Sequence, residues 1–498
     1  MPFSPPLRRY AAAWVALLGL ACAPVPASPD AAPSSPDARA PAPSDGGRAD
    51  ATSPVTDAAI GTDGGNDAGD VDPPVDAAAE DAAVPDECAV TLTPGTTTPR
   101  PTWGVPRPAL RRTFRDEHTG ACVTRVTEAS DDAAGANPPA WIRHEYSRRA
   151  AYNADSSLAV MLSSNGWWHL YDVPAWTHRG ELAVGALSEP TWHPTEPNLL
   201  RYVGRDGAGA RVMQLDTRSG DARVLADLAS ELRGVWPAAS RGWTKEEGRP
   251  SRDGQILTWQ VERDDFGILG VAVIDLSRPA GSRVLGTLST DQRPDHVSTT
   301  PSGRFAVVSW LDGTYAYPVD RAAGTVDFRD SARRLLHARS EHSDLAIGAG
   351  GEDLFVYYDY IEGEIAMVDV ATGARTALLP IYGADHSAFA GHVAGGAFDM
   401  PGWAVVSTYG CTIDYGARPC AHGERFGDDR LALVELRAGG RVLSIAHMHN
   451  GGDDYWSEPQ ATVNRDLTRI LFAARWESPD VEVSSYEVRL PAGSLTLP

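Results

Sequence analysis

Short apolar runs, each preceded by a cluster of turn residues, recur along most of the chain. The clearest copy is residues 298–310, STTPSGRFAVVSW, where a Pro-Ser-Gly turn leads into a run of apolar and aromatic residues. Six further copies occupy residues 153–163, 193–203, 251–261, 348–358, 398–408 and 464–474. Apolar and polar positions alternate around them with the period of β-strands, and Gly, Asp or Pro stands at the corners. We therefore expect this region to be nearly all strand.

The spacing of the seven copies predicts the architecture. Successive copies begin roughly 40 to 66 residues apart, which is the range for propeller blades built from four short strands. We therefore predict an all-β fold, a seven-bladed β-propeller of four-stranded blades. The expected blades are residues 140–186, 187–232, 233–289, 290–338, 339–383, 384–450 and 451–490.

An additional hairpin pattern precedes the first blade. Residues 112–127 read as a strand, a Thr-Gly turn and another strand, like the outer hairpins expected at 211–225 and 366–379. Propellers protect their sheet edges, commonly by letting strands from one terminus complete a blade begun at the other. We therefore predict that this hairpin joins the last blade. A closed ring leaves no free edge strand to pair, so we expect a monomer.

The N-terminal segment predicts export. Residues 1–22 have a basic start and an apolar core that is too short to span a membrane, as in a secretory signal. The segment ends in Leu-Gly-Leu-Ala-Cys22, which resembles the processing site of bacterial lipoproteins. We expect a lipid anchor on Cys22 and a place at the outer membrane or cell surface. With ordinary cleavage near Ala27, the chain would instead be periplasmic or extracellular.

Residues 23–87 are predicted to be a disordered acidic linker, which leaves 88–498 for the propeller. The linker is rich in Ala, Pro, Asp, Ser and Gly and contains fourteen acidic residues and two arginines. It has too few large apolar residues to offset the entropy of folding. Much of the net charge of −22 therefore belongs to the linker. An acidic exported chain without basic stripes is not expected to bind nucleic acid.

Four cysteines remain after Cys22. An even number in an exported chain favours disulfides, and their spacing does not match a zinc site. Proximity in sequence suggests Cys88 with Cys122 and Cys411 with Cys420, although four cysteines allow three pairings. The second pair would clamp a polar insertion, residues 410–427, on one face of the sixth blade.

Polar residues stand shortly before each recurring turn, where the innermost strand of a propeller blade lines the central channel. Seven blades would bring these residues to one axis and form a polar ligand site. The candidate binding residues are Glu189, Glu247, His296, Asp344, Glu458 and Gln460, and Ser147, Asp295 and Glu341 occupy similar positions.

Three residues of the first blade suggest catalysis. His144, Tyr146 and Arg148 alternate along one expected strand and would share a face. β-Elimination from a uronic acid needs a base beside the carboxylate, here His144 or Tyr146, and a cation such as Arg148 to stabilise the enolate. In the other interpretation this is an ordinary charged strand, with Tyr146 packed between blades.

Histidines near the expected channel suggest a metal site. His342, His386 and His392 are the candidate ligands, with His447 and His449 on another strand. In the alternative, these imidazoles bond to the backbone or line a wet channel.

The recurring turn resembles the repeat of TolB-type and WD40-like propellers. Together with Glu341-His-Ser-Asp344 and the closing segment 456–466, the chain looks most like the oligogalacturonate-lyase-type propellers over residues 141–490. The resemblance implies elimination across uronic-acid linkages and a divalent metal, Mn²⁺ or Ca²⁺, held by histidines and a glutamine. By position His342 and His392 would be ligands. The sequence differs in the last blade, where Glu458 and Gln460 stand in place of histidines.

Two functions from different classes remain. In the first, the chain binds an acidic oligosaccharide in its central funnel and acts as a lyase-like enzyme. In the second, it is a non-catalytic propeller that binds an envelope protein or glycan.

Overall fold

The computed structural model describes residues 92–94, 104–132, 138–382, 389–411, 429–451, 454–491, 493 and 495. All of them belong to one compact unit of the chain. Several predictions lie outside the described residues, namely the signal segment with Cys22, the linker, Cys88, His386, Cys420 and nearly all of the insertion. No helix among the described residues is long and apolar enough to cross a membrane.

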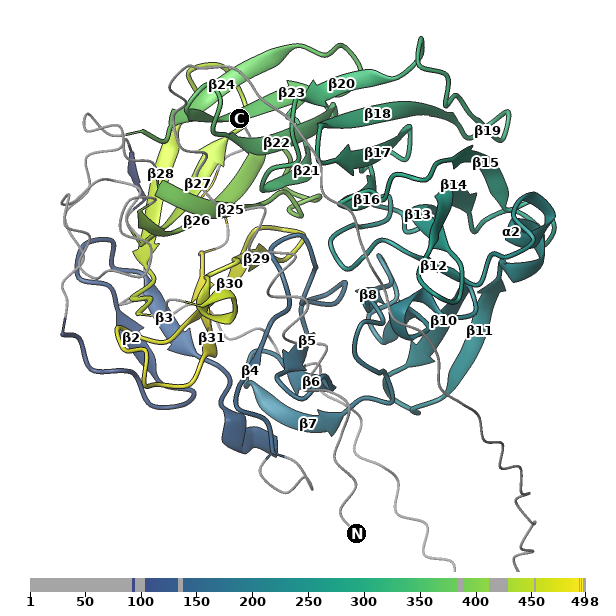
Figure 1. Cartoon of the computed structure of the whole chain (residues 1–498). Helices are drawn as coiled ribbons and strands as arrows, with labels where there is room; N and C mark the ends of the chain where they lie inside the picture. Colours follow the sequence, from purple (N-terminus) through teal and green to yellow (C-terminus); the bar gives the residue numbers. More distant parts are fainter. Residues whose placement is uncertain are drawn as a thin grey trace, which may run out of the picture. The chain divides into compact units, whose positions relative to one another are not determined.

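The described unit is built from six largely antiparallel sheets, three of them four-stranded, so the expectation of an all-β fold is confirmed. Figure 1 shows the sheets of this unit following one another in chain order around a common centre. The first set of strands, which we call the first sheet, contains β4 (Ile142–Arg143), β5 (Leu158–Ser163), β6 (Trp168–Asp172) and β7 (Thr177–Glu181), and strand pairing joins it to the last group described below in one nine-stranded sheet. The second contains β8 (Thr191–Trp192), β9 (Leu199–Val203), β10 (Arg211–Asp216) and β11 (Ala222–Asp227).

The middle of the chain forms three further sheets. One contains β12 (Arg241–Trp243), β13 (Ile256–Glu262), β14 (Ile268–Asp275) and β15 (Val284–Ser289). The next contains β16 (His296–Thr299), β17 (Phe305–Trp310), β18 (Gly313–Asp320), β19 (Thr325–Val326) and β20 (Arg334–His337). The third contains β21 (Ser343–Ile347), β22 (Asp353–Asp359), β23 (Glu364–Asp369) and β24 (Arg375–Pro380).

The C-terminal strands combine with strands from the N-terminal side. One sheet contains β25 (Phe389–Ala394), β26 (Trp403–Cys411), β27 (Arg430–Glu435) and β28 (Val442–His447), with β1 (Thr93–Pro94) on its edge. The last group contains β29 (Thr462–Val463), β30 (Arg469–Ala474) and β31 (Ser484–Arg489), followed by β3 (Cys122–Arg125) and β2 (Thr113–Arg115). Val123 of β3 lies opposite Val488 of β31. One parallel pair, Ser484 with Ile142, connects this group to β4.

Short helices lie between some of these strands. The α-helix α2 (Ala229–Val235) lies beside β15 (Figure 1), and the sequence pattern did not predict it. Three 3₁₀-helices complete the described elements: η2 (Ala129–Asp132), η3 (Arg205–Gly207) and η4 (Tyr455–Ser457).

The recurring turn has a physical basis in a repeated side-chain clamp. In four copies the first turn residue accepts a hydrogen bond through its side-chain oxygen from the backbone N–H five residues later. The four pairs are Asn153 with Leu158 at 3.0 Å, Ser251 with Ile256 at 3.0 Å, Thr300 with Phe305 at 3.2 Å and Asn464 with Arg469 at 3.0 Å. In all four, the backbone N–H of the first residue also donates to the later residue's carbonyl. Asn, Ser and Thr are suited to this local bonding.

The hydrophobic core lies largely between neighbouring sheets. Leu158 and Trp168 of the first sheet, for example, pack with Leu200 and Leu215 of the second. This packing of sheet against sheet holds the innermost strand of each sheet near the centre of the unit. The polar residues that precede the recurring turns lie on or beside these innermost strands.

Asp116, in the turn between β2 and β3, fastens this hairpin to β28. Its Oδ2 accepts a hydrogen bond from the backbone N–H of His447 at 2.9 Å and lies 3.1 Å from Nδ1 of the same residue. Its Oδ1 accepts from the backbone N–H of Thr119 at 2.9 Å. Burial opposes ionisation, but the hydrogen bonds and charge of His447 hold the pKa of Asp116 well below its usual range.

Cys122 is buried at the start of β3, and its sulfur is not a free thiol. Because the described residues include no second cysteine side chain that could serve as its partner, both pairings stay predictions.

Asp116→Asn should lower the free energy of unfolding by about 2 kcal/mol at neutral pH, since a buried charged acceptor is lost. The folded-state pKa of Asp116 is depressed, so its contribution is present above the unfolded pKa, about 3.9, and falls as pH drops below it. The difference between wild type and variant in urea denaturation should therefore shrink in acid. Asp221→Asn, an exposed carboxylate, is the control. A difference that stays constant with pH would contradict this role.

Candidate functional site

Polar residues from six separate segments meet at the centre of the described unit. We call this set the central cluster, and it comprises Tyr146, Arg148, Glu247, His296, His342, His392 and Glu458. The segments follow β4 and β12, lie within β16 and β25, and precede β21 and β29. The contacts form a chain: Glu247 to Arg148, Arg148 to Tyr146, Tyr146 to His392, and His392 to both His342 and Glu458.

Arg148 occupies the middle of the central cluster. Its Nη1 lies 3.0 Å from Glu247 Oε2, and its Nε donates to the backbone carbonyl of Ser343. The guanidinium carbon lies 5.6 Å from the centre of the Tyr146 ring. Burial opposes the charge, but Tyr146, Glu247 and nearby carboxylates raise the pKa of Arg148 above its ordinary value. Arg148 is therefore a fixed positive charge with acidic groups around it.

His392 has an unusual environment for a buried imidazole. The residue is 1% exposed, and neither ring nitrogen has a hydrogen-bond partner. Its Nε2 lies 3.4 Å from Glu458 Oε2, and its ring stacks on His342 with 4.4 Å between the centres. Burial, followed by the charges of His342 and nearby arginines, holds the pKa of His392 well below its usual range. The ring is neutral at physiological pH, and buried polar atoms without partners mark candidate ligand sites.

A second group of charges adjoins Glu247. His296 Nδ1 lies 3.8 Å from Glu247 Oε2 and 3.6 Å from Asp295 Oδ2. Lys245 Nζ lies 3.7 Å from Asp295 Oδ1. Burial opposes ionisation of Asp295, but His296 and then Lys245 hold its pKa well below the usual range. The Lys245, Glu247 and Asp295 side chains are 16% to 24% exposed, so solvent reaches the cluster on this side.

His144 lies outside this chain of contacts. β4 ends at Arg143, so the strand alternation expected to align residues 144, 146 and 148 does not continue. His144 Nε2 lies 2.8 Å from the Gln460 carbonyl, and its Nδ1 lies 3.1 Å from Ser485 Oγ. Burial, and then the charge of Arg143, lower the pKa of His144 to about 3. Both ring nitrogens are engaged within the fold, which removes His144 as the base.

Three predicted binding residues are also engaged within the fold. Glu189 accepts hydrogen bonds from the backbone and hydroxyl of Thr244 and from the backbone of Glu246. Asp344 is paired with Arg249 and accepts from the Gly395 backbone at 2.7 Å. Gln460 Oε1 accepts from Arg143 Nη2 at 2.6 Å. The contacts of Glu189 and Asp344 join segments of different sheets, and that of Gln460 joins the segment before β29 to β4.

Buried arginines are the feature that sequence reasoning missed. In one interpretation this segment was an ordinary charged strand, but its Arg143 and Arg149 are 0% and 6% exposed. Arg149 donates to the Gly248 carbonyl at 2.7 Å and lies 3.1 Å from Glu145. Desolvation lowers the pKa of Arg143 to about 10, so it stays charged. The dense basic pattern RHEYSRR at residues 143–149 was the available signal.

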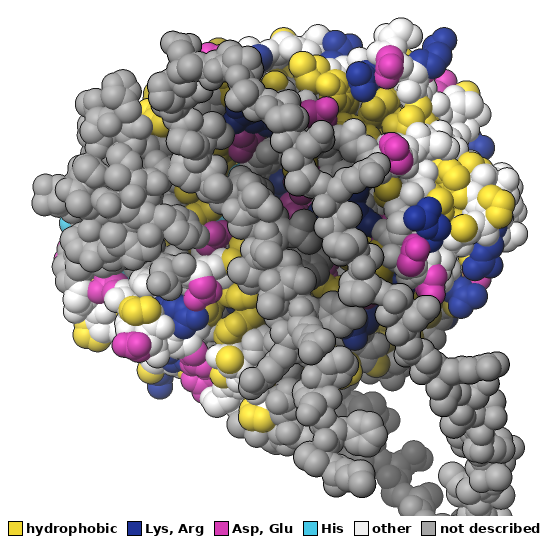
Figure 2. All heavy atoms as spheres, viewed as in Figure 1, with side chains coloured by type: hydrophobic (Ala, Val, Ile, Leu, Met, Phe, Trp, Pro, Cys, Tyr) yellow, Lys and Arg dark blue, Asp and Glu magenta, His cyan; other side chains and the backbone are white. Residues whose placement is uncertain are grey.

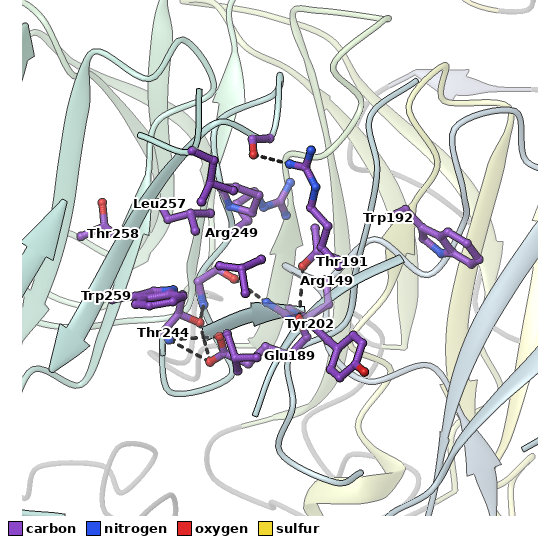
Figure 3. Close-up of a pocket in the computed structure, with 17 residues that line it drawn as sticks. Arg149, Glu189, Thr191, Trp192, Tyr202, Thr244, Arg249, Leu257, Thr258 and Trp259 are labelled. Carbon is purple, nitrogen blue, oxygen red and sulfur yellow. Dashed lines mark hydrogen bonds between the residues drawn. The ribbon is translucent and has the colours of Figure 1, made fainter. Parts of the chain in front are cut away.

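A small cavity lies beside the central cluster, between the sheets of β8–β9 and β12–β13. Figure 3 shows Glu189 hydrogen-bonded to Thr244 at one end, with Trp259 and Leu257 along a wall. Its volume is about 50 Å³, far below the roughly 300 Å³ or more of ordinary ligand pockets. This cavity has room for water but not for a sugar ring.

The described side chains visible on one face of the unit include both signs of charge. Figure 2 shows basic and acidic side chains interspersed on the visible face, with apolar side chains between them. Long-range attraction of a highly charged partner is therefore not indicated by the visible described surface.

Among the described residues, three ligand atoms suited to a metal approach within 4.8 Å of one another at Asp132, His169 and Glu181. His169 and Glu181 lie on β6 and β7, Asp132 lies at the end of η2, and the triad was not predicted. The predicted central ligands His342 and His392 are in ring contact, while His386 is outside the described residues.

Comparison with known proteins supports the fold. No family model and no curated protein sequence matches the chain. Among solved structures, an oligogalacturonate lyase in complex with manganese matches with a TM-score of 0.53 and 16% identity, over 78% of this chain and 97% of the other. The oligogalacturonate lyase of Vibrio parahaemolyticus matches with a TM-score of 0.50 and 14% identity, over 77% and 97%. At these identities the likeness shows a propeller-like fold alone.

Glu341, beside His342, should make stability depend on pH. Burial raises its pKa to about 7, only partly offset by His342. A raised folded-state pKa means that stability is lost as pH rises through that value. Glu341→Gln, which stays neutral, should gain about 1–2 kcal/mol relative to wild type between about pH 5 and pH 8. Urea denaturation at both pH values measures this, with exposed Glu362→Gln as control. Parallel pH profiles for wild type and Glu341→Gln would rule out the raised pKa.

Proposed function

We propose that this chain is an exported seven-bladed β-propeller that binds an acidic oligosaccharide at the central cluster and cleaves it by lyase-like β-elimination. The observation that carries the proposal is His392, a buried imidazole whose two ring nitrogens make no hydrogen bond and whose Nε2 faces Glu458 Oε2 at 3.4 Å. Ring contacts connect it through Tyr146 to the fixed charge of Arg148. An imidazole, a phenol and a guanidinium are the groups that such an elimination needs.

Strand pairing supports the seven-bladed ring. The last group has three C-terminal strands, β29, β30 and β31, and β3 and β2 extend it from the N-terminal side. Counting this group separately from β4–β7 gives seven sets of strands around the centre. In this proposal β2–β3 closes the ring, which protects the edge of the last blade.

Each group has a role in the proposed reaction. Glu458 orients Nε2 of His392, which leaves Nδ1 to take the proton beside the sugar carboxylate, as carboxylate–imidazole pairs do elsewhere. The electrons of the broken C–H bond form the new C=C bond while the glycosidic C–O bond breaks. Burial raises the pKa of Tyr146 well above its usual value, so its O–H is retained and supplies a proton to the leaving oxygen. Arg148 stabilises the enolate charge.

The same atoms also suit a divalent cation. His392 and Glu458 provide an imidazole nitrogen and a carboxylate oxygen 3.4 Å apart, and His342 stacks beside them. Mn²⁺ accepts such ligands, and Ca²⁺ prefers the oxygen. One similar structure contains manganese. A cation here would supply charge for the sugar carboxylate, where the surrounding acids of this chain would otherwise repel it.

The enzymatic proposal is tested by incubating the full chain with pectin, ulvan and glucuronan fragments and following the absorbance of unsaturated uronates, with and without Mn²⁺ or Ca²⁺. Tyr146→Phe should lower kcat by roughly 10²- to 10⁴-fold because the leaving oxygen loses its proton donor. Tyr202→Phe, outside the cluster, should retain wild-type activity.

An absence of absorbance gain with every substrate would remove the lyase function. If calorimetry still detected binding of a uronate, the chain would be a non-catalytic glycan-binding propeller. An absence of both would favour a propeller that mediates protein–protein contacts in the envelope.

We further propose that Cys22 carries a lipid anchor and that the acidic linker holds the propeller away from the membrane. The support is the sequence Leu-Gly-Leu-Ala-Cys22 and the extended, like-charged linker. Cys22→Ala should move the protein from the membrane fraction to the soluble fraction of bacterial cells. Cys88→Ala is the control, and membrane association of the Cys22 variant equal to wild type would contradict the anchor.

A further inference from the structure

A compact cluster of metal-ligand side chains lies on the outer part of the first sheet. His169 of β6 and Glu181 of β7 are directly opposite each other in the strand pairing. Asp132, at the end of η2, reaches the same place from the segment that follows β3. One ligand atom from each of the three side chains lies within 4.8 Å of the other two.

His169 is aimed into this cluster without a partner for one nitrogen. The residue is 0% exposed, its Nδ1 lies 3.0 Å from His178 Nε2, and its own Nε2 has no hydrogen-bond partner. Since His178 occupies Nδ1, Nε2 is the nitrogen left for an ion. Asp132 Oδ2 is likewise buried without a partner. Unpartnered buried polar atoms are rare in folded proteins and need an explanation.

Two arginines of the same region pair with carboxylates that do not belong to the cluster. Arg111 pairs with Asp131 at 3.0 Å, and Arg179 pairs with Asp172 at 2.6 Å. Two carboxylates beside an imidazole nitrogen form a negative site that attracts a positive species. A metal ion would supply that charge, and so would a proton shared by Asp132 and Glu181.

The donor set and its surroundings suit a transition metal ion. One imidazole and two carboxylates are ligands of Zn²⁺ and Mn²⁺, with bonds of about 2.0–2.2 Å. Such bonds place two ligands of one ion at most about 4.4 Å apart, so the cluster needs to close by less than about 1 Å. His178 is positioned as the outer partner that fixes the ligand imidazole, as is usual in metal sites. Glu181 is exposed, so water can complete the coordination.

We propose that Asp132, His169 and Glu181 form a binding site for a zinc- or manganese-class divalent ion that fastens η2 to the β6–β7 hairpin. η2 follows β3, and β3 pairs with β31 of the last group, whereas β6 and β7 belong to the first sheet. Between these groups the strand pairing shows the single parallel pair Ser484 with Ile142. The ion would therefore connect the segment that follows β3, in the last group, to β6 and β7 of the first sheet. This site is separate from the central cluster and does not depend on its function.

The test is a metal titration of the full chain after removal of metal with a chelator. Isothermal calorimetry with Zn²⁺ and with Mn²⁺ should detect a site of one equivalent that disappears in Glu181→Gln and in Asp132→Asn. The matched control Glu196→Gln, an exposed carboxylate outside the cluster, should retain it. His392→Gln should also retain it, which separates this site from any cation at the central cluster.

A second readout is thermal stability. Saturation at about a hundred times Kd should raise the Tm of wild type by roughly 2–5 °C, and the two cluster variants should lose this rise. Glu181→Gln changes an exposed side chain, so the variant is expected to fold. The proposal fails if wild type binds neither ion, or if both cluster variants bind as wild type does.

Discussion

Burial of arginine side chains at the inner ends of the sheets is the constraint on which the described unit depends. Removing a guanidinium from water costs several kcal/mol unless its N–H groups find partners. Arg148 and Arg249 find them on other sheets, at Ser343 and Glu247 and at Asp344. Arg143 of β4 finds one at Gln460, in the distant segment that precedes β29. Because each charge is satisfied only when two separate segments meet correctly, these contacts fix the inner segments relative to one another. The apolar contacts between sheets provide the bulk stability, and the arginines provide the geometry.

The polar residues at the centre fall into two groups, those bonded within the fold and those left to bind a ligand. Glu189, Asp344 and Gln460 give their polar groups to the fold, and so does His144. After these are assigned, His392 keeps two ring nitrogens without hydrogen-bond partners, in contact with Tyr146 and beside Glu458. Polar residues that stabilise the fold and polar residues available to a ligand therefore lie next to one another at the centre. The two groups contain the same residue types, and only their hydrogen-bond partners distinguish them.

The strand pattern and the convergence of Arg148, Glu247, His342 and His392 followed from the sequence, because a repeated turn places residues before it at equivalent positions. The prediction that His144 is the base was wrong for a local reason. Side chains alternate between faces only within a strand, and β4 ends at Arg143, before His144. The cluster of Asp132, His169 and Glu181 was not predictable, because it depends on the register of β6 against β7 and on where the chain after β3 lies. Such contacts between outer strands carry no repeated signal. Helix α2 was not predicted because it lies in one connection between sheets, that from β11 to β12, and therefore belongs to no repeated pattern.

Nuclear magnetic resonance of the full chain labelled with ¹⁵N-histidine tests the central claim most directly, with His392→Gln used to assign the His392 signals. The account predicts that the His392 imidazole remains neutral from mildly acidic to mildly alkaline pH, and that its nitrogen shifts move when an oligogalacturonate is added. An imidazole that titrates near its ordinary pKa, or shifts that do not respond to any uronate, would contradict it.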